Sequence, residues 1–416
     1  MATRLTADDV VIENLLTHLK AEKYSLRTQR CYPAKARQLL DYCSRNGLPI
    51  EIIRTVQVTG FLRRQYRLSR KRHSNLPPFQ RWRHRYTGAI NMLLRVVHGR
   101  WPVPDIPRNA LEAFHRDLVN DYDSWLRDLR GLCTVTRIKR VGRALQFLTF
   151  LGSGANTESL RHLGVRALDA YVQHCCAGLG RASIEERTVC LRDFLRHLYR
   201  RKRLAADLSA TVIGPRIYEH EGIPPALRAE EVQKVIEVTR ADRSMTGLRD
   251  YAILVLLSTY GLRAAEIVRL RLDDIDWRME VLRVRHAKTE TYSELPLLPE
   301  PGEALLRYLE KARPRSAYRE VFLRKLPPYR PFKGGSILNC VTGARLRAAG
   351  VHPQGKKGPH AFRHARAVSL LRSGVPLKVI GDVLGHTSAQ ATAEYLKLAT
   401  EDLRAVGLEL PSGVSP

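Results

Sequence analysis

The part of the sequence between residues 360 and 395 carries side chains that could do chemistry on a phosphodiester. His360 and Arg363 are three residues apart and would share one face of a helix, and His386 and Tyr395 follow. A tyrosine hydroxyl loses its proton only near pH ~10, so its attack at neutral pH needs a proton acceptor and a positive pocket. Histidine supplies the first. Arginine supplies the second, because its planar fork donates bidentately to phosphate oxygens.

Three short helices are predicted to hold these side chains. Pro359 stands before an apolar-periodic run, which indicates a helix that begins there. Pro376 opens a second helix, and Gly385 suits its left-handed C-cap, so His386 lies in the turn beyond. A third helix, which starts with capping-box spacing, would hold Tyr395. Histidine, arginine and tyrosine can therefore converge.

A further arginine and a candidate proton donor lie upstream. Residues 250–260 are apolar nearly all round, which predicts a buried helix that Gly261 ends. Arg263 follows at the start of an amphipathic helix, where backbone donors and the helix dipole favour an anion. Two alternating segments flank residues 287–290 and predict a β-hairpin with Lys288 at its tip. A lysine there could enter a minor groove and protonate a departing 5′ oxygen.

In their order along the chain, these motifs resemble those of the tyrosine recombinases, the family of phage and transposon integrases. The resemblance covers roughly residues 224–400, and the ordered set is specific where each piece alone is weak. The matching motifs are Gly-Leu-Arg-Ala-Ala-Glu from Gly261, Ala-Lys-Thr from Ala287, His-Ala-Phe-Arg from His360, Leu-Gly-His-Thr from Leu384, and Tyr395.

The resemblance implies a role for each matched residue. Tyr395 would be the nucleophile, and Arg263 and Arg363 would clamp the phosphate. Lys288 would be the general acid, although Lys311 is another basic candidate for that role. The remaining roles are His360 as the base, His386 as a further phosphate donor, and Glu266 as the residue that orients Arg263.

The resemblance also implies a fold and a reaction. The fold class is mainly α with a small antiparallel β-sheet, in which helical, SAM-like core-binding domains precede a DNA breaking-rejoining catalytic domain. Strand cleavage would make a 3′-phosphotyrosine bond and free a 5′-hydroxyl, and rejoining would reverse that step. This scheme uses neither ATP nor a metal. His360 and His364 have the spacing of a zinc pair, but Ala361 stands where a metalloprotease carries its glutamate.

The charge of the chain points to double-stranded DNA as its partner. The 416 residues carry a net charge of +29, and no acidic residue lies between Glu51 and Asp105. Binding through phosphates would be strongly salt-dependent. The residues that we expect to contact DNA are Arg81, Arg83, Arg85, Arg137, Lys139, Arg140, Arg143, Lys356 and Lys357.

Four segments are predicted. Residues 1–107 would form an additional helical DNA-binding arm, 108–215 a core-binding helical domain, 216–400 the catalytic domain and 401–416 a tail. The first two segments show an internal repeat that pairs Thr28 with Thr136 and Gln38 with Gln146. The arm is therefore interpreted as a duplicated core-binding module. Chance similarity between amphipathic helices is the alternative.

Cysteines and apolar runs indicate the compartment. The seven cysteines have irregular spacing and are interpreted as reduced, mostly buried thiols of a cytosolic protein. No signal peptide or membrane span is predicted, so we expect a cytoplasmic protein that joins the nucleoid when it binds DNA. In the arm, Trp82 and Tyr86 lie among the arginines, and packing is favoured over stacking on bases.

Three function classes are in play. The first is a site-specific recombinase of a mobile element, which works as a homo-tetramer on synapsed DNA or together with related recombinases. The second is a type IB-like topoisomerase, which uses similar chemistry to relax supercoils. The third is a non-catalytic architectural partner of related recombinases. The additional DNA-binding module and the integrase-like motifs favour the first class.

Overall fold

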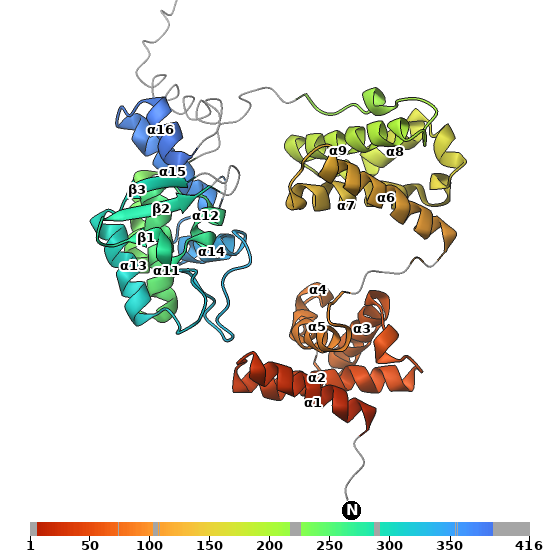
Figure 1. Ribbon diagram of the computed structural model, residues 1–416, viewed down its shortest axis with the longest axis horizontal. Coiled ribbons are helices and arrows are strands. Elements are labelled where there is room, and N and C mark those ends of the chain that lie inside the picture. The colour runs from red at the N-terminus through yellow and green to blue at the C-terminus, as the bar shows by residue number, and fades with distance from the viewer. Residues whose placement is uncertain are drawn as a thin grey trace, which may run out of the picture. The chain divides into compact units, whose positions relative to one another are not determined.

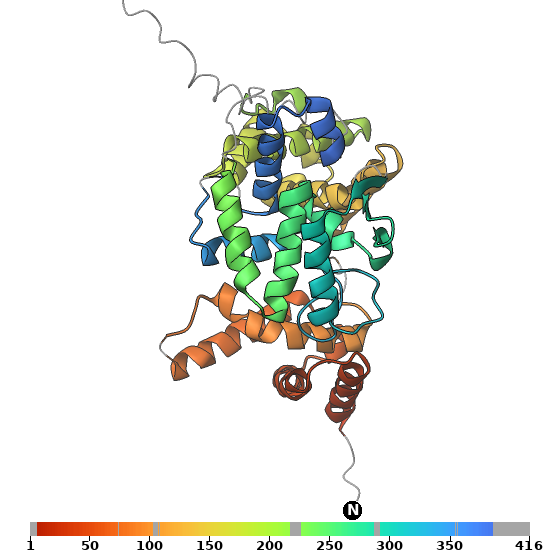
Figure 2. The same cartoon turned by 90° about the vertical axis from the view of Figure 1, so that its left-hand side faces the viewer.

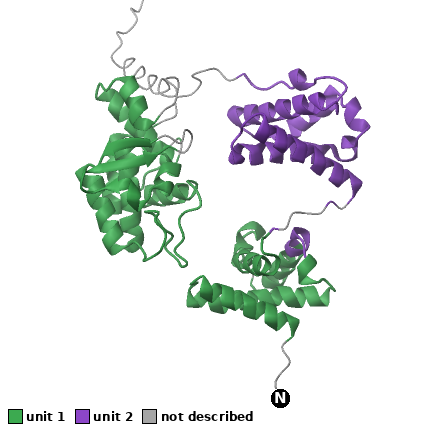
Figure 3. Cartoon of the chain, in the orientation of Figure 1, with its two compact units in different colours: residues 1–52, 60–101, 222–416 green, residues 53–59, 102–221 purple. Residues whose placement is uncertain are grey.

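The computed structural model describes residues 6–73, 75–102, 107, 109–216, 226–286, 292–353, 355 and 357–385. The chain divides into two compact units, residues 1–52, 60–101 and 222–416 in one, and residues 53–59 and 102–221 in the other (Figure 3). The described part is mainly helical with one three-stranded antiparallel sheet, which confirms the predicted fold class. None of the described helices is long and apolar enough to cross a lipid bilayer.

The first two N-terminal helices start at side-chain caps. Thr6 and Asp9 form a capping box at the start of α1, and the Ser25 hydroxyl accepts from the backbone N–H of Thr28 at the start of α2. Trp82 is only 2% exposed, and its ring lies against Tyr66 and Tyr86, which confirms packing as its role. The helices are α1 (Ala7–Ala21), α2 (Leu26–Arg45), α3 (Thr55–Arg72), α4 (Phe79–Trp82) and α5 (His84–His98), labelled in Figure 1.

The next helices repeat features of the first set. The Thr136 hydroxyl contacts Cys133 at the start of α7, as the Thr28 hydroxyl contacts Ser25 at the start of α2. Both helices bury apolar residues with the same spacing, namely Ala36, Leu39 and Leu40 in α2 and Ala144, Phe147 and Leu148 in α7. The shared caps and spacing are expected of a repeat, and the duplication of a whole module stays a prediction. The helices are α6 (Ala110–Asp128), α7 (Thr134–Leu151), α8 (Val165–Cys176) and α9 (Arg181–Arg200).

Helix α11 (Met245–Tyr260) is the centre of the C-terminal core. Every residue from Ala252 to Leu257 is at most 1% exposed, as the all-round apolar run predicts. Helix α11 packs against α10 (Ala229–Ala241), α13 (Pro299–Lys311) and α15 (Pro359–Arg372). Figure 2 shows α10 and α11 in green beside α13 in teal. Helices from distant parts of the sequence thus share one core.

The predicted hairpin is present. Strands β2 (Val281–Arg285) and β3 (Tyr292–Pro296) pair antiparallel, with Arg285 opposite Tyr292, and β1 (Ile275–Asp276) pairs with the other edge of β2. Leu282, Val284 and Leu295 face the core, because alternate side chains of a strand point the same way. The tip of the hairpin, with Lys288, lies outside the described residues.

Two left-handed glycines end the helices that lead to the site. Gly261, with φ of 66°, caps α11, and α12 (Ala264–Arg269) begins just beyond it. Gly385, with φ of 62°, caps α16 (Leu377–Leu384). Both caps were predicted from the sequence. Helix α14 (Ile337–Ala348) completes the described set.

The cysteines differ from expectation. All seven are free thiols. However, only Cys43 and Cys190 are buried, and burial raises the pKa of each thiol to about 11. Cys31, Cys133 and Cys340 are exposed. The expectation of mostly buried thiols was therefore wrong, because Cys31 and Cys340 fall on the solvent-facing sides of α2 and α14.

Candidate active site

Two arginines that are far apart in the sequence meet at the end of α16. Arg363 on α15 donates from Nη2 to the carbonyl oxygen of Leu384 at 2.6 Å and from Nη1 to that of Gly261 at 2.7 Å. Arg263, the N-cap of α12, donates from Nη2 to the carbonyl oxygen of Gly385 at 2.8 Å. The two guanidinium groups thus hold consecutive carbonyls, and they are oriented before any ligand arrives.

A buried carboxylate holds Arg263 in place. Glu266 is 3% exposed, and its Oε1 accepts from Nη1 of Arg263 at 2.9 Å. Its Oε2 accepts from the backbone N–H of Arg263 at 2.7 Å. One residue therefore fixes both the side chain and the backbone of the arginine, and the pairing offsets the cost of burying the charge. This geometry agrees with the orienting role that the resemblance implies.

Sequence reasoning missed His286, which extends this network to the sheet. Its Nδ1 lies 2.9 Å from Oε1 of Glu266, and its Nε2 lies 2.7 Å from Oγ of Ser293 on β3. Because the carboxylate only accepts, Nδ1 donates to it. The ring also packs against Gly385, where a Cβ would overlap it. His286 thus joins β2, β3, α12 and the end of α16.

A signal for His286 was present in the strand pattern. Leu282 and Val284 face the core, so the next residue in the alternation is His286, which is 6% exposed. A buried imidazole needs hydrogen-bond partners. Glu266 was already expected nearby, and pairing the two would have predicted the contact.

The described residues include only part of the predicted catalytic set. His360 is exposed on the first turn of α15, and its ring centroid lies 6.1 Å from that of the buried His364. Lys288, His386 and Tyr395 lie outside the described residues, so their roles stay predictions. Lys311, the other candidate for the general acid, is exposed in the last turn of α13.

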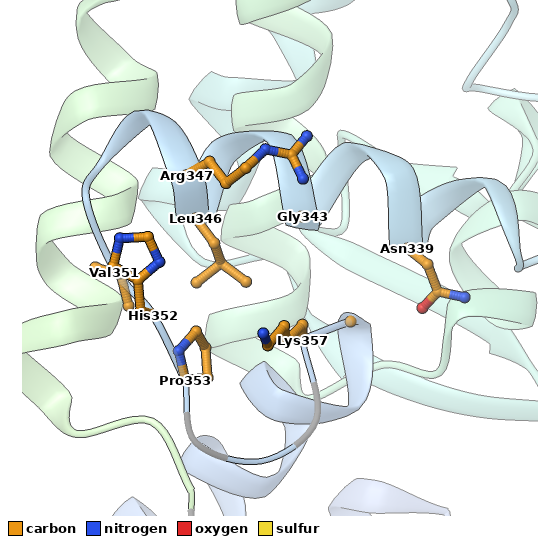
Figure 4. A pocket seen from close by; sticks show the side chains of 9 residues that line it. Asn339, Gly343, Leu346, Arg347, Val351, His352, Pro353 and Lys357 are labelled. Atoms are coloured by element: carbon orange, nitrogen blue, oxygen red, sulfur yellow. The ribbon is translucent and has the colours of Figure 1, made fainter. Parts of the chain in front are cut away.

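A cavity of ≈ 500 Å³ lies beside the start of α15. Lys357 and Gly358 line it together with Asn339 and Arg347 of α14 (Figure 4). Lys357 is exposed, and Lys356 lies outside the described residues. Two cations therefore border a cavity at the helix that carries His360 and Arg363, and phosphate contact by Lys357 stays a prediction.

The predicted DNA-contact residues of α7 are all engaged with acids of their own module. Arg137 donates to both oxygens of Asp123, and Arg140 pairs with the buried Asp193. Lys139 and Arg143 share Glu186. These ion pairs offset much of the positive charge, and only Lys139 has a side chain more than half exposed. DNA contact by this set stays a prediction.

The predicted residues of the N-terminal arm have a different setting. Arg81, Arg83 and Arg85 are all exposed around the junction of α4 and α5. None of the three forms an ion pair within the described residues. Their charge is available to a polyanion, and contact with DNA stays a prediction here too.

Comparison with known proteins gives consistent matches. Residues 225–402 match the phage integrase family. Over 189 residues, the chain is 52% identical to "Putative integrase/recombinase y4gC" of Sinorhizobium fredii (strain NBRC 101917 / NGR234), with 45% of this chain and 97% of that protein covered. It is 37% identical over 295 residues to "Putative integrase/recombinase y4rA" of the same strain, with 70% of each covered. The fold is similar to that of a lambda integrase tetramer bound to a Holliday junction, with a TM-score of 0.53, 18% identity, and 74% of this chain and 85% of that chain covered.

Proposed function

The chain belongs to the phage integrase family of tyrosine recombinases, and from this premise we propose that it cleaves and rejoins DNA strands through a 3′-phosphotyrosine intermediate. One observation carries the proposal. Arg263 and Arg363 meet at the carbonyls of Leu384 and Gly385, directly before His386. A pair of oriented arginines at one point is what a phosphoryl-transfer transition state needs.

The proposed cleavage forms one phosphorus–oxygen bond, breaks another, and transfers one proton at each of the two oxygens. The Tyr395 oxygen attacks the scissile phosphorus and gives its proton to His360, while the arginine pair stabilises the charge on the non-bridging oxygens. The bond to the 5′ oxygen breaks, and that oxygen takes a proton from Lys288. Rejoining runs in reverse, when a 5′-hydroxyl of another strand attacks the phosphotyrosine. The energy of the broken phosphodiester bond is kept in the phosphotyrosine bond, so the scheme requires no ATP. The arginine pair supplies the charge stabilisation that a metal could otherwise give, so the scheme also requires no metal.

The proposed biological setting is recombination of a mobile element. Related proteins carry integrase or recombinase names, and lambda integrase forms a tetramer on a Holliday junction. We infer double-stranded DNA as the partner and a homo-tetramer on two synapsed duplexes as the working form, with related recombinases as further partners. A cytoplasmic protein that joins the nucleoid on binding DNA fits this setting.

Tyr395→Phe tests the mechanism, because it deletes the nucleophilic oxygen and little else. A nicked suicide substrate made from DNA that flanks the gene should trap a covalent adduct with the wild-type protein, and peptide mapping should place it at Tyr395. The variant should form no adduct and should bind the same DNA with unchanged affinity. Tyr318→Phe is the matched control, since Tyr318 is an exposed tyrosine within the segment that matches the phage integrase family. An adduct that persists in Tyr395→Phe would refute the assignment.

The alternatives predict different products. A recombinase should join strands from two differently marked duplexes, whereas a type IB-like topoisomerase should relax supercoiled DNA and return each strand to its own partner. A purely architectural partner should form no adduct at all, and Tyr395→Phe should leave its activity unchanged. We expect joined strands from both duplexes.

A further inference from the structure

A cavity of ≈ 340 Å³ lies between α2, α3 and α5 and has no assigned role. We propose that it binds backbone phosphates of duplex DNA and so gives the N-terminal helices their own DNA-binding site. This inference rests on the proposed function and names a site for its DNA substrate outside the catalytic residues. The residues that define this N-terminal groove are Gln38, Tyr42, Arg45, Arg64, Arg72 and Tyr86.

The charge of the N-terminal groove is strongly unbalanced. Arg45, Arg64 and Arg72 line it, and Asp41 is the one carboxylate among its lining residues. In the part of the chain that the structure describes, none of the three arginines forms an ion pair. The guanidinium of Arg64 lies 5.8 Å from the ring centroid of Tyr42, a contact that orients the cation without neutralising it. Arginines that surround one hollow repel each other, and a bound anion would relieve that repulsion.

A second cavity in the next helical set has similarly spaced lining residues but a different charge, so the arginines of the N-terminal groove are not needed to form such a cavity. It has a volume of ≈ 640 Å³ and is lined by residues of α7, α8 and α9. Gln146 and Phe150 line it with the same spacing that Gln38 and Tyr42 have in the N-terminal groove. Both hollows therefore come from a similar arrangement of helices.

The second cavity holds only one arginine. Arg187 lines it, and this side chain already donates from Nη1 to the carbonyl oxygen of Cys175 at 2.6 Å. The arginines of the nearby α7 are paired with acids, as described above. The unpaired cations of the N-terminal groove are thus not a requirement of this helical arrangement. These unpaired cations occur only in the first helical set. Folding does not require them there, so we look for a functional reason for their presence.

Phosphate is the anion that fits these side chains. The planar guanidinium fork matches two phosphate oxygens, and the amide of Gln38 and the hydroxyl of Tyr42 add neutral donors. DNA is favoured over a free phosphate, because the surrounding span from residue 52 to 104 contains no acidic residue. A positive field of that length attracts a polyanion and steers it onto the groove.

A pair of double variants on one helix tests the proposal. Arg64→Ala with Arg72→Ala removes two cations from the N-terminal groove. Arg63→Ala with Arg70→Ala removes two exposed cations that do not line it, and helical periodicity places them on the opposite side of α3. Both variants change the net charge equally. Affinity of the full chain for a fluorescent duplex of mixed sequence is measured by anisotropy over a series of salt concentrations.

The expected result is a difference between the two variants. Arg64→Ala with Arg72→Ala should weaken binding at least about tenfold and lower the slope of log affinity against log salt by about two, because two phosphate contacts are lost. The control should keep the wild-type slope. Equal effects of the two variants, or an unchanged slope in the groove variant, would overturn the proposal. Thermal stabilisation by inorganic phosphate at constant ionic strength, with DNA affinity unchanged in the groove variant, would also overturn it in favour of a free anion.

A separate readout distinguishes this proposal from the catalytic one. Tyr395→Phe should form no adduct on the suicide substrate and should keep the wild-type salt slope, because the groove arginines remain in place. Failure of the groove proposal removes the difference in salt slope between the two double variants and leaves the wild-type adduct intact. Failure of the catalytic proposal removes the adduct and leaves that difference in place.

Discussion

Glu266 joins three parts of the candidate site through one carboxylate. Its two oxygens accept from the side chain and backbone of Arg263 and from His286. A glutamine has the same shape but presents an NH₂ group in place of one oxygen. In either orientation that NH₂ faces an N–H donor of Arg263, so one buried donor loses its acceptor. The charge and the geometry of Arg263 therefore depend on a carboxylate at this position.

Glu266→Gln should lower the rate of DNA cleavage by about a hundredfold, because a misplaced arginine no longer meets the phosphate oxygens. The measurement is the single-turnover rate of adduct formation on a suicide substrate at saturating protein. Glu231→Gln is the matched control, since Glu231 occupies the same capping-box position at the start of α10, in a different part of the core. If the two variants cleave at equal rates, Glu266 has only a structural role.

At the scale of elements, the turn after α16 must pass very close to His286. Gly385 has a left-handed φ of 62°, and a Cβ there would overlap the imidazole ring of His286. Gly374, between α15 and α16, also has a positive φ, of 77°, but a Cβ there would meet nothing within 4 Å. A substitution at Gly374 therefore tests backbone strain alone, whereas one at Gly385 tests backbone strain together with the clash against His286.

Gly385→Ala should therefore cost more than Gly374→Ala. Both variants should lose roughly 1 to 2 kcal/mol of unfolding free energy, because alanine is strained in a left-handed conformation. Only Gly385→Ala must also move His286 or the end of α16, and we expect it to lose DNA cleavage as well as stability. Chemical denaturation and adduct formation are measured on both variants. Equal losses would show that the backbone conformation, and not the contact with His286, sets the requirement for glycine.

An ion-pair network connects α10, α11 and α14, and its pH dependence can be stated. Arg345 of α14 pairs with Asp242 and with the buried Asp250. A hydrogen bond from Ser244 and the Arg345 guanidinium lower the pKa of Asp242 to about 2, below its ordinary value of 3.8. Because the folded-state pKa lies below the unfolded value, the charged Asp242 stabilises the fold above pH ~4, and this is lost as the pH falls toward about 2.

Asp242→Asn should lower the free energy of unfolding by about 1 kcal/mol at pH 7, a value reduced for the partial exposure of this side chain. An asparagine keeps the acceptor for Ser244 and removes only the charge that faces Arg345. Urea denaturation of both proteins between pH 7 and pH 3 should show the difference shrinking below about pH 4. A difference that does not change with pH would mean that the charge of Asp242 is irrelevant to stability.

Local signals made the elements of the site predictable. Pro359 and Pro376 mark helix starts, and Gly261 and Gly385 mark helix ends, because each residue type suits one backbone position. Contacts between side chains of different helices and strands were harder to predict from the sequence. The pairing of Arg140 with Asp193 depends on tertiary distances that no local pattern encodes. Arg137 was expected to be free for DNA for the same reason, and it is paired with Asp123.

At the scale of the whole molecule, the buried apolar residues form separate clusters. The middle cluster runs from Leu118 to Val212 and the C-terminal cluster from Leu227 to Phe362, and no residue belongs to both. Phe147 is fully buried in the first, and Phe322 is fully buried in the second. Cooperative unfolding needs shared contacts, so each cluster should respond to its own cavity mutation.

Phe147→Ala and Phe322→Ala should each cost about 3 to 5 kcal/mol and should each act on one cluster. Hydrogen exchange of the full chain, resolved by peptides, should show lost protection in residues 118–212 for the first variant and in residues 227–362 for the second. Uniform loss across both ranges would mean that the clusters unfold as one cooperative unit. Separate responses would have a functional consequence, because the helices of the middle cluster could then loosen or change while the arginine pair at Leu384 and Gly385 keeps its geometry.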